Sequence, residues 1–162
     1  EVLYTLVIVS HSTRQILHVA VTSHPTAEWT AQQIVEAFPW DSTPRYLLRD
    51  NDAIYGAVYR ERLKGMNIRD IRTAYRSPWQ NAFAERLIGS IRRECLNHTI
   101  IRNTRHLRRT LKCYADYYNN DRTHLSLKKN APSGRQFTTG GGNIVAFPRV
   151  NGLHHRYQRS AA

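Results

Sequence analysis

The sequence has 162 residues, of which 41% are hydrophobic, with three Trp, four Phe and nine Tyr. This length suits one domain with a packed core, and the aromatic content excludes a disordered chain. The formal net charge is +12, and no apolar run approaches the roughly 20 residues of a membrane-spanning helix, so a membrane-spanning protein is excluded.

Strands and helices alternate in the elements predicted over most of the chain. They are strands over 3–9 and 15–22, a helix over 26–38, a strand over 45–49, a helix over 53–64, a strand over 67–73, and helices over 77–96 and 104–118. Thr26 is placed to cap the first helix, and Ser77 with Pro78 to open the third. The first two strands form an antiparallel hairpin, and this order predicts an α/β layer with a mixed sheet and flanking helices.

A change of composition divides the chain into two parts. Residues 1–130 form the predicted α/β unit, whereas residues 131–162 form a basic tail without any Asp or Glu. In the tail, Ile144–Tyr157 contains two short apolar or aromatic runs around Asn151-Gly152, a dipeptide typical of hairpin turns. We therefore expect a short hairpin appended to the main unit.

The positive charge is concentrated in the second half of the chain. Residues 1–50 carry a net charge of −2, whereas residues 76–130 carry +8 and residues 131–162 carry +4. A basic half beside an acidic half is typical of a protein that binds a polyanion, and the excess of Arg suits phosphate contacts. We expect DNA to be the partner and no membrane to be bound.

Two cysteines, Cys95 and Cys113, are too few for a disulfide framework. Both fall in predicted helices, where they are expected to pack as small apolar residues. This usage favours the reducing cytoplasm.

Two separated carboxylates are candidates for a metal site. Asp50 follows a buried strand, at the strand end where open α/β sheets place their ligands, and Asp52 is its rival. Glu85 lies on the predicted 77–96 helix, away from the buried stripe of Phe83, Leu87, Ile91 and Cys95. Carboxylates that converge on one cleft bind Mg²⁺ or Mn²⁺, and a third carboxylate would make the site more secure.

Two segments resemble the catalytic cores of retroviral-type integrases and bacterial insertion-sequence transposases. Arg49–Asp52 is similar to the motif around the second Asp of that family's Asp-Asp-Glu triad, and Ser77–Arg86 is similar to the motif around its Glu. Asp50 lies 35 positions before Glu85, the spacing typical of the family, whereas Asp52 lies 33 before it. Tyr117–His124 is similar to a further family signature. Asp52 stands where the family usually has Gly.

The resemblance implies a ribonuclease-H-like fold, a divalent cation, and cutting and joining of DNA strands in integration or transposition. Asp50 and Glu85 would be catalytic metal ligands, in a homo-oligomer that acts on mobile-element ends and target DNA in a bacterial, nucleoid-associated setting. The family's first Asp lies on a strand before residue 3, and no residue here fills that position. This chain alone is therefore expected to lack that strand and to be inactive or poor at catalysis, and the alternative is a non-catalytic, DNA-binding transposase remnant.

Further residues are predicted to contact DNA because they are basic or polar and lie close to the site or in one cluster. They are Asn81, Arg86, Arg92, Arg93, Arg105, Arg108, Arg109, Lys112, Arg122 and His124.

Overall fold

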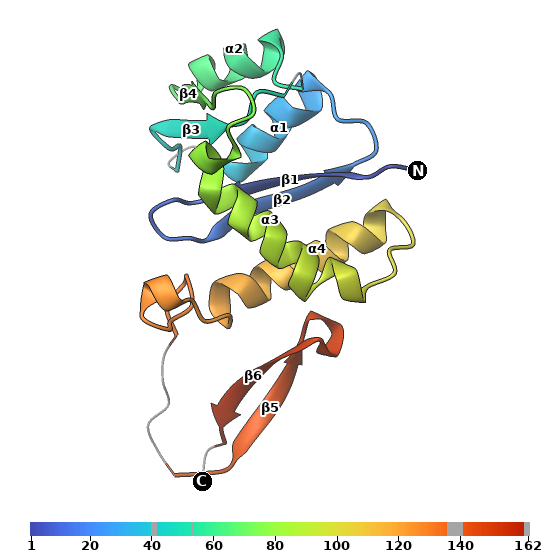
Figure 1. Cartoon of the computed structure of the whole chain (residues 1–162), viewed down its shortest axis with the longest axis vertical. Helices are drawn as coiled ribbons and strands as arrows, with labels where there is room; N and C mark the ends of the chain where they lie inside the picture. The colour runs from blue at the N-terminus through green and yellow to red at the C-terminus, as the bar shows by residue number, and fades with distance from the viewer. Residues whose placement is uncertain (40–41, 53, 136–140, 161–162) are drawn as a thin grey trace.

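The computed structural model describes residues 1–39, 42–52, 54–135 and 141–160, and its helices and strands are those of the α/β class predicted (Figure 1). The strands are β1 (Tyr4–Val9), β2 (Ile16–Thr22), β3 (Tyr46–Arg49), β4 (Arg69–Arg72), β5 (Ile144–Arg149) and β6 (His154–Arg159). The helices are α1 (Ala27–Ala37), α2 (Ala57–Gly65), α3 (Ala82–Glu94) and α4 (Thr104–Asn120), with short 3-10 turns η1 (Pro78–Asn81), η2 (Leu96–His98), η3 (Leu125–Leu127) and η4 (Val150–Gly152). No helix in these ranges is long and apolar enough to cross a membrane.

The strands pair two by two. The β1 and β2 strands form the predicted antiparallel hairpin, and β3 pairs with β4 in parallel, as the α2 crossover between them requires. The single mixed sheet predicted from the element order does not form among the described residues, because no strand bridges β1 and β3. The two ribbons are instead separate, and α1, α2, α3 and α4 pack around them (Figure 1).

Two apolar clusters hold these layers together. One joins α3 and α4 to β2 through Leu87, Ile91, Leu111 and Tyr114, and the other joins α1 and α2 beside β1. Of the predicted buried stripe on α3, Leu87, Ile91 and Cys95 are buried, as expected from their helical spacing. Phe83 is only partly buried, and the Arg14 guanidinium lies 3.5 Å from the centroid of its ring.

The two predicted helix starts differ in outcome. The Thr26 hydroxyl accepts a hydrogen bond from the Trp29 amide at 3.1 Å, which confirms the cap of α1. Ser77 is not a cap, because its hydroxyl donates to the Tyr75 carbonyl and the chain first winds as η1. The predicted 77–96 helix is thus η1 followed by α3, and α2 begins at Ala57, after a turn at residues 54–55, rather than at Ala53, which lies outside the described residues.

Candidate active site

Asp50 lies directly after β3 and is oriented by its neighbour. The guanidinium of Arg49 is buried and makes a bidentate ion pair with Asp70 on β4, at 2.8 and 2.7 Å. Its third nitrogen donates to the Asp50 carbonyl at 3.1 Å. Because the cross-strand ion pair fixes Arg49, the backbone at Asp50 is held in one position and its side chain borders a cavity.

The two candidate aspartates have different roles. Partial burial and the nearby charge of Asp52 raise the pKa of Asp50, so a cation beside it would relieve an unfavourable charge. The Asp52 carboxylate accepts a hydrogen bond from the Ile54 amide at 3.0 Å, which closes a local turn. Asp52 is also not among the described residues that line the cavity. These contacts favour Asp50 over Asp52 as a ligand for a cation.

Glu85 lies in the first turn of α3, where the helix dipole favours a negative charge, and its side chain is exposed. Ile88 and Arg92 of the same helix line the cavity. At about 100° per residue, Glu85 falls about 20° from Arg92 and about 60° from Ile88 around the helix axis. Glu85 is therefore on the side of α3 that carries Arg92, although it is not itself among the described residues that line the cavity.

The cavity has a volume of about 1000 Å³ and lies between the free edges of β1 and β3. Its lining includes every residue of Leu3–Ser12 and of Pro44–Asp50, whereas alternate residues would line it if each strand presented one face. Among the described residues, no backbone hydrogen bond outside the two ribbons involves Tyr4–Val9 or Tyr46–Leu48. Apolar side chains complete the walls, among them Ile34, Phe38, Leu87, Ile91 and Leu111.

The residues predicted to contact DNA occupy three kinds of position. Asn81 and Arg92 line the cavity. Arg108 donates to the Val21 carbonyl at 3.2 Å, which ties α4 to β2, and the Arg93 guanidinium lies over Gly89, close to the position that a Cβ there would take. The remaining members on α3 and α4 have exposed side chains: Arg86, Arg105, Arg109 and Lys112.

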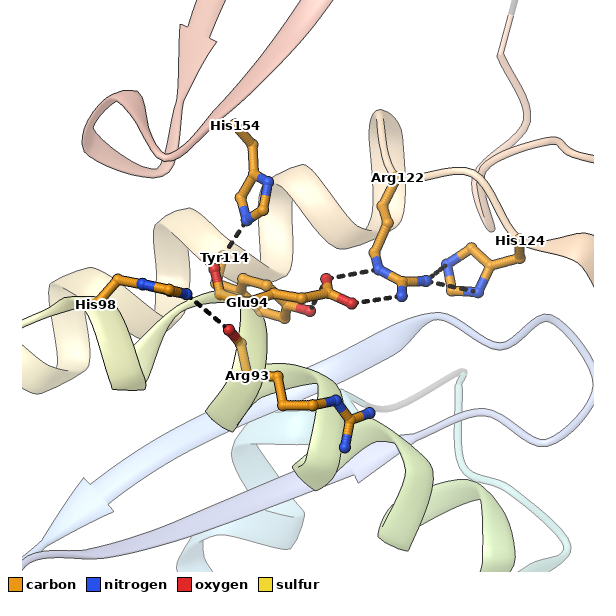
Figure 2. A network of polar contacts seen from close by, with 7 residues as sticks. All are labelled: Arg93, Glu94, His98, Tyr114, Arg122, His124 and His154. Atoms are coloured by element: carbon orange, nitrogen blue, oxygen red, sulfur yellow. Dashed lines mark hydrogen bonds and ion pairs between the residues drawn. The ribbon is translucent and has the colours of Figure 1, made fainter.

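Arg122 and His124 belong to an internal network instead of an open surface (Figure 2). Arg122 makes a bidentate ion pair with Glu94, the last residue of α3, at 2.7 and 2.6 Å, and the Tyr114 hydroxyl donates to the same carboxylate at 2.8 Å. Burial alone would raise the pKa of Glu94, but these hydrogen bonds outweigh it and hold that pKa below its ordinary value. Burial and the Arg122 charge lower the pKa of His124, so this ring is neutral at pH 7.

Glu94 is the central residue of this network, and the sequence did not indicate that role. It lies nine positions after Glu85 on α3 and connects α4 and β6, because its carbonyl also accepts a hydrogen bond from His154 at 2.8 Å. A lone Glu near a helix end is most often solvated, so only the long-range contacts with Arg122 and Tyr114 identify its role.

The donor set beside Asp50 fits a hard divalent cation in its chemistry, because carboxylate and amide oxygens are the ligands such ions bind. Asp50 and Asn81 line the cavity and offer such oxygens, whereas Glu85 is not among the described lining residues. Within the described ranges, no group of three or more His, Cys, Asp or Glu side chains is close enough together to hold a metal ion.

Comparisons with known proteins agree with the fold of the chain. Residues 66–132, which include β4 and all of α3 and α4, match the family model of the integrase core domain. This match covers 67 of the 162 residues, so in that part the chain is similar to integrase core domains. No curated protein is similar to the chain at a significant level.

The fold of the chain is similar to that of two solved structures. A chain of the simian T-cell lymphotropic virus intasome, solved in complex with PP2A regulatory subunit B56 gamma, is 13% identical with a TM-score of 0.64 over 96% of this chain. The catalytic core domain of BIV integrase is 15% identical with a TM-score of 0.60, covering 80% of this chain and 82% of that one. The chain spans 60% of the length of the simian virus chain. These likenesses confirm the predicted ribonuclease-H-like arrangement.

Proposed function

We propose that this chain is an integrase-type domain that cuts a DNA phosphodiester bond and joins the freed end to a second DNA, with Asp50 and Glu85 as ligands of Mg²⁺ or Mn²⁺. In the first step water attacks the phosphorus and the bond to the 3′ oxygen breaks, which leaves a 3′ hydroxyl. In the second step that hydroxyl attacks a phosphorus of the other DNA and displaces its 3′ oxygen. The second step exchanges one phosphodiester for another and needs no further co-reactant.

The position of Asp50 carries the proposal. Its carboxylate borders the cavity at the end of β3, its backbone is held through Arg49, and Asn81 of the turn before α3 lines the same cavity. When bound, divalent cations stabilise charge on the attacking and leaving oxygens of such a displacement. Asp50 and Glu85 would hold the cations, and Asn81 and Arg92 would orient the phosphate at the rim.

The cavity between β1 and β3 has room for an extended segment, which could bring a third ligand for the cation. A strand lying there would pair with both free edges and would cover Ile34, Phe38 and Leu87. Its end would lie at the level of Asp50, because β3 ends there. A carboxylate at that end is the third donor that the proposed chemistry needs, and without such a segment we expect weak cation binding and little activity.

The distribution of charge supports DNA as the substrate. Exposed Arg105, Arg109 and Lys112 on α4 and Arg86 on α3 form a basic surface without an ion pair among the described residues. Contacts of this kind bind phosphates without reading sequence. By analogy with the intasome relative, we expect the active form to be an oligomer.

A plasmid-nicking and strand-transfer assay with Mn²⁺ tests the proposal, on the full product of the reading frame that encodes this chain. Glu85→Gln and Asp50→Asn should each abolish both products while leaving DNA affinity nearly unchanged. Glu61→Gln, which alters an exposed carboxylate on α2, is the matched control and should retain activity. Undiminished nicking by the Glu85→Gln variant would overturn the assignment. Salt-sensitive DNA binding without any nicking by the wild type would favour the non-catalytic alternative.

A further inference from the structure

The C-terminal hairpin of β5 and β6 packs against the rest of the protein at its turn. Val150 of that turn is buried in the apolar cluster of α3 and α4. The His154 ring stacks on Tyr117 with centroids 4.3 Å apart and hydrogen bonds to the Glu94 carbonyl. The buried Asp121 carboxylate pairs with Arg149 at 2.8 Å and with Arg156 at 3.4 Å. These contacts attach the hairpin to the same network that holds Arg122 (Figure 2).

The other end of the hairpin projects away from the rest of the protein (Figure 1). Cross-strand partners share a face, so the register places Ile144, Ala146 and Pro148 on one face with Arg159, Tyr157 and His155. All six are exposed, Ile144 and Tyr157 by about two thirds. We name this face the outer face of the hairpin. A two-stranded ribbon alone is marginally stable, so an anchored ribbon with an open face is suited to receive a partner.

The positive charge of the hairpin indicates what kind of partner its outer face binds. Asp121 is the last carboxylate side chain of the sequence, and the 41 residues after it carry seven Lys or Arg. The ion pairs of Arg149 and Arg156 with Asp121 face the domain, whereas Arg159 lies on the outer face, where its guanidinium donates to the Gly142 carbonyl at 3.1 Å. Arg159, His155 and the Tyr157 hydroxyl therefore present hydrogen-bond donors and positive charge without any acidic neighbour on the same face.

We propose that the outer face of the β5–β6 hairpin is a binding site for duplex DNA. A two-stranded β-ribbon fits the major groove, and Arg and Tyr side chains contact phosphate and sugar oxygens. The apolar stripe of Ile144, Ala146 and Pro148 would lie against sugars and base edges. The site lies at the opposite end of the molecule from α2 (Figure 1), and it rests on the proposed function in requiring DNA as the ligand.

Fluorescence anisotropy with a labelled 30-base-pair duplex of mixed sequence, over a series of salt concentrations, tests this site. Arg159→Gln should weaken binding several-fold and reduce the slope of log affinity against log salt by about 0.9, the effect of one lost phosphate contact. Arg159→Lys keeps the charge and should preserve the slope. Arg60→Gln on α2 removes an exposed charge far from the hairpin and is the matched control. Tyr157→Ser should weaken binding without changing the slope.

The outcomes separate this site from the proposed function. A wild-type protein that does not bind the duplex would overturn both proposals. Wild-type binding with equal affinity and slope for Arg159→Gln and Arg60→Gln would overturn the hairpin site alone. Circular dichroism checks that each variant is folded. A change of oligomeric state in Tyr157→Ser on sedimentation, with DNA affinity unchanged, would assign the outer face to a second copy and would also overturn the proposal.

Discussion

Replacing Arg122 by Ala should destabilise the protein without weakening DNA binding. The side chains of Arg122 and Glu94 are 23% and 25% exposed, so their ion pair is intermediate between a surface pair and a buried one. Surface pairs contribute about 0–1 kcal/mol, whereas removing one partner of a buried pair costs about 3–5 kcal/mol. The substitution should therefore cost about 2–3 kcal/mol, which lowers the Tm of a domain of this size by roughly 4–12 °C.

Thermal and urea unfolding followed by circular dichroism measure this cost. Arg109→Ala, at an exposed position of α4, is the control and should change stability by no more than about 0.5 kcal/mol. The Arg122→Ala/Glu94→Gln double variant should lose less than the sum of the two single losses, because both variants remove the same contact. An Arg122→Ala protein as stable as the wild type, with DNA affinity lost instead, would refute this reasoning and restore Arg122 as a DNA contact.

Acid pH should remove part of the stability that the Arg122–Glu94 ion pair contributes. The folded-state pKa of Glu94 lies below its ordinary value of 4.5, so the stability from this pair is present above that value and is lost as pH falls through the folded pKa. Scanning calorimetry between pH 7 and pH 3 should show the Tm gap between wild type and Arg122→Ala closing, and a constant gap would contradict the ion pair. The effect of Asp50 on stability has the opposite sign. Because the pKa of Asp50 is raised, its negative charge disfavours the folded protein without a bound cation at neutral pH. Asp50→Asn should raise the Tm at pH 7 and leave it unchanged near pH 3, where both forms are neutral; a lower Tm at pH 7 would oppose this. Leu87→Ala should lower the free energy of unfolding by about 2–5 kcal/mol in chemical denaturation, because the Leu87 side chain is 2% exposed. Ile88→Ala should lower it much less, because Ile88 is 37% exposed. Arg105→Gln/Arg109→Gln should reduce the salt slope of duplex binding by about 1.8 if both side chains contact phosphates, and an unchanged slope would exclude them.

Local patterns predicted the elements well because each carries its own signal. The strand over 3–9, the cap at Thr26 and the stripe of Leu87, Ile91 and Cys95 depend on neighbours in sequence, and the structure confirms all three. The hairpin at Asn151-Gly152 is also present, although its turn is longer than a two-residue one, with positive φ at Val150, Asn151 and Gly152.

Long-range partners explain what the sequence did not predict. The order of the predicted strands does not determine which strands are adjacent, and the structure leaves β1–β2 and β3–β4 as separate ribbons. Arg122 matched a basic surface residue in sequence, but its partner Glu94 is 28 positions away. The sequence already favoured Asp50 over Asp52 by its spacing to Glu85, and the turn that Asp52 closes with Ile54 and the lining of the cavity agree with that preference, although the role of Asp50 as a metal ligand stays a prediction. The roles of Glu85 and the basic α4 face remain predictions.

The most direct test of the proposed site is paramagnetic line broadening by Mn²⁺ in the amide NMR spectrum of the protein. At low Mn²⁺ the amides of Asp50 and Asn51 and those of the first turn of α3 around Glu85 should broaden together, and Asp50→Asn should abolish both effects. Broadening at Asp50 that leaves the Glu85 turn unaffected, or broadening centred on another acidic segment such as that of Glu28 and Glu36, would contradict a shared divalent-cation site.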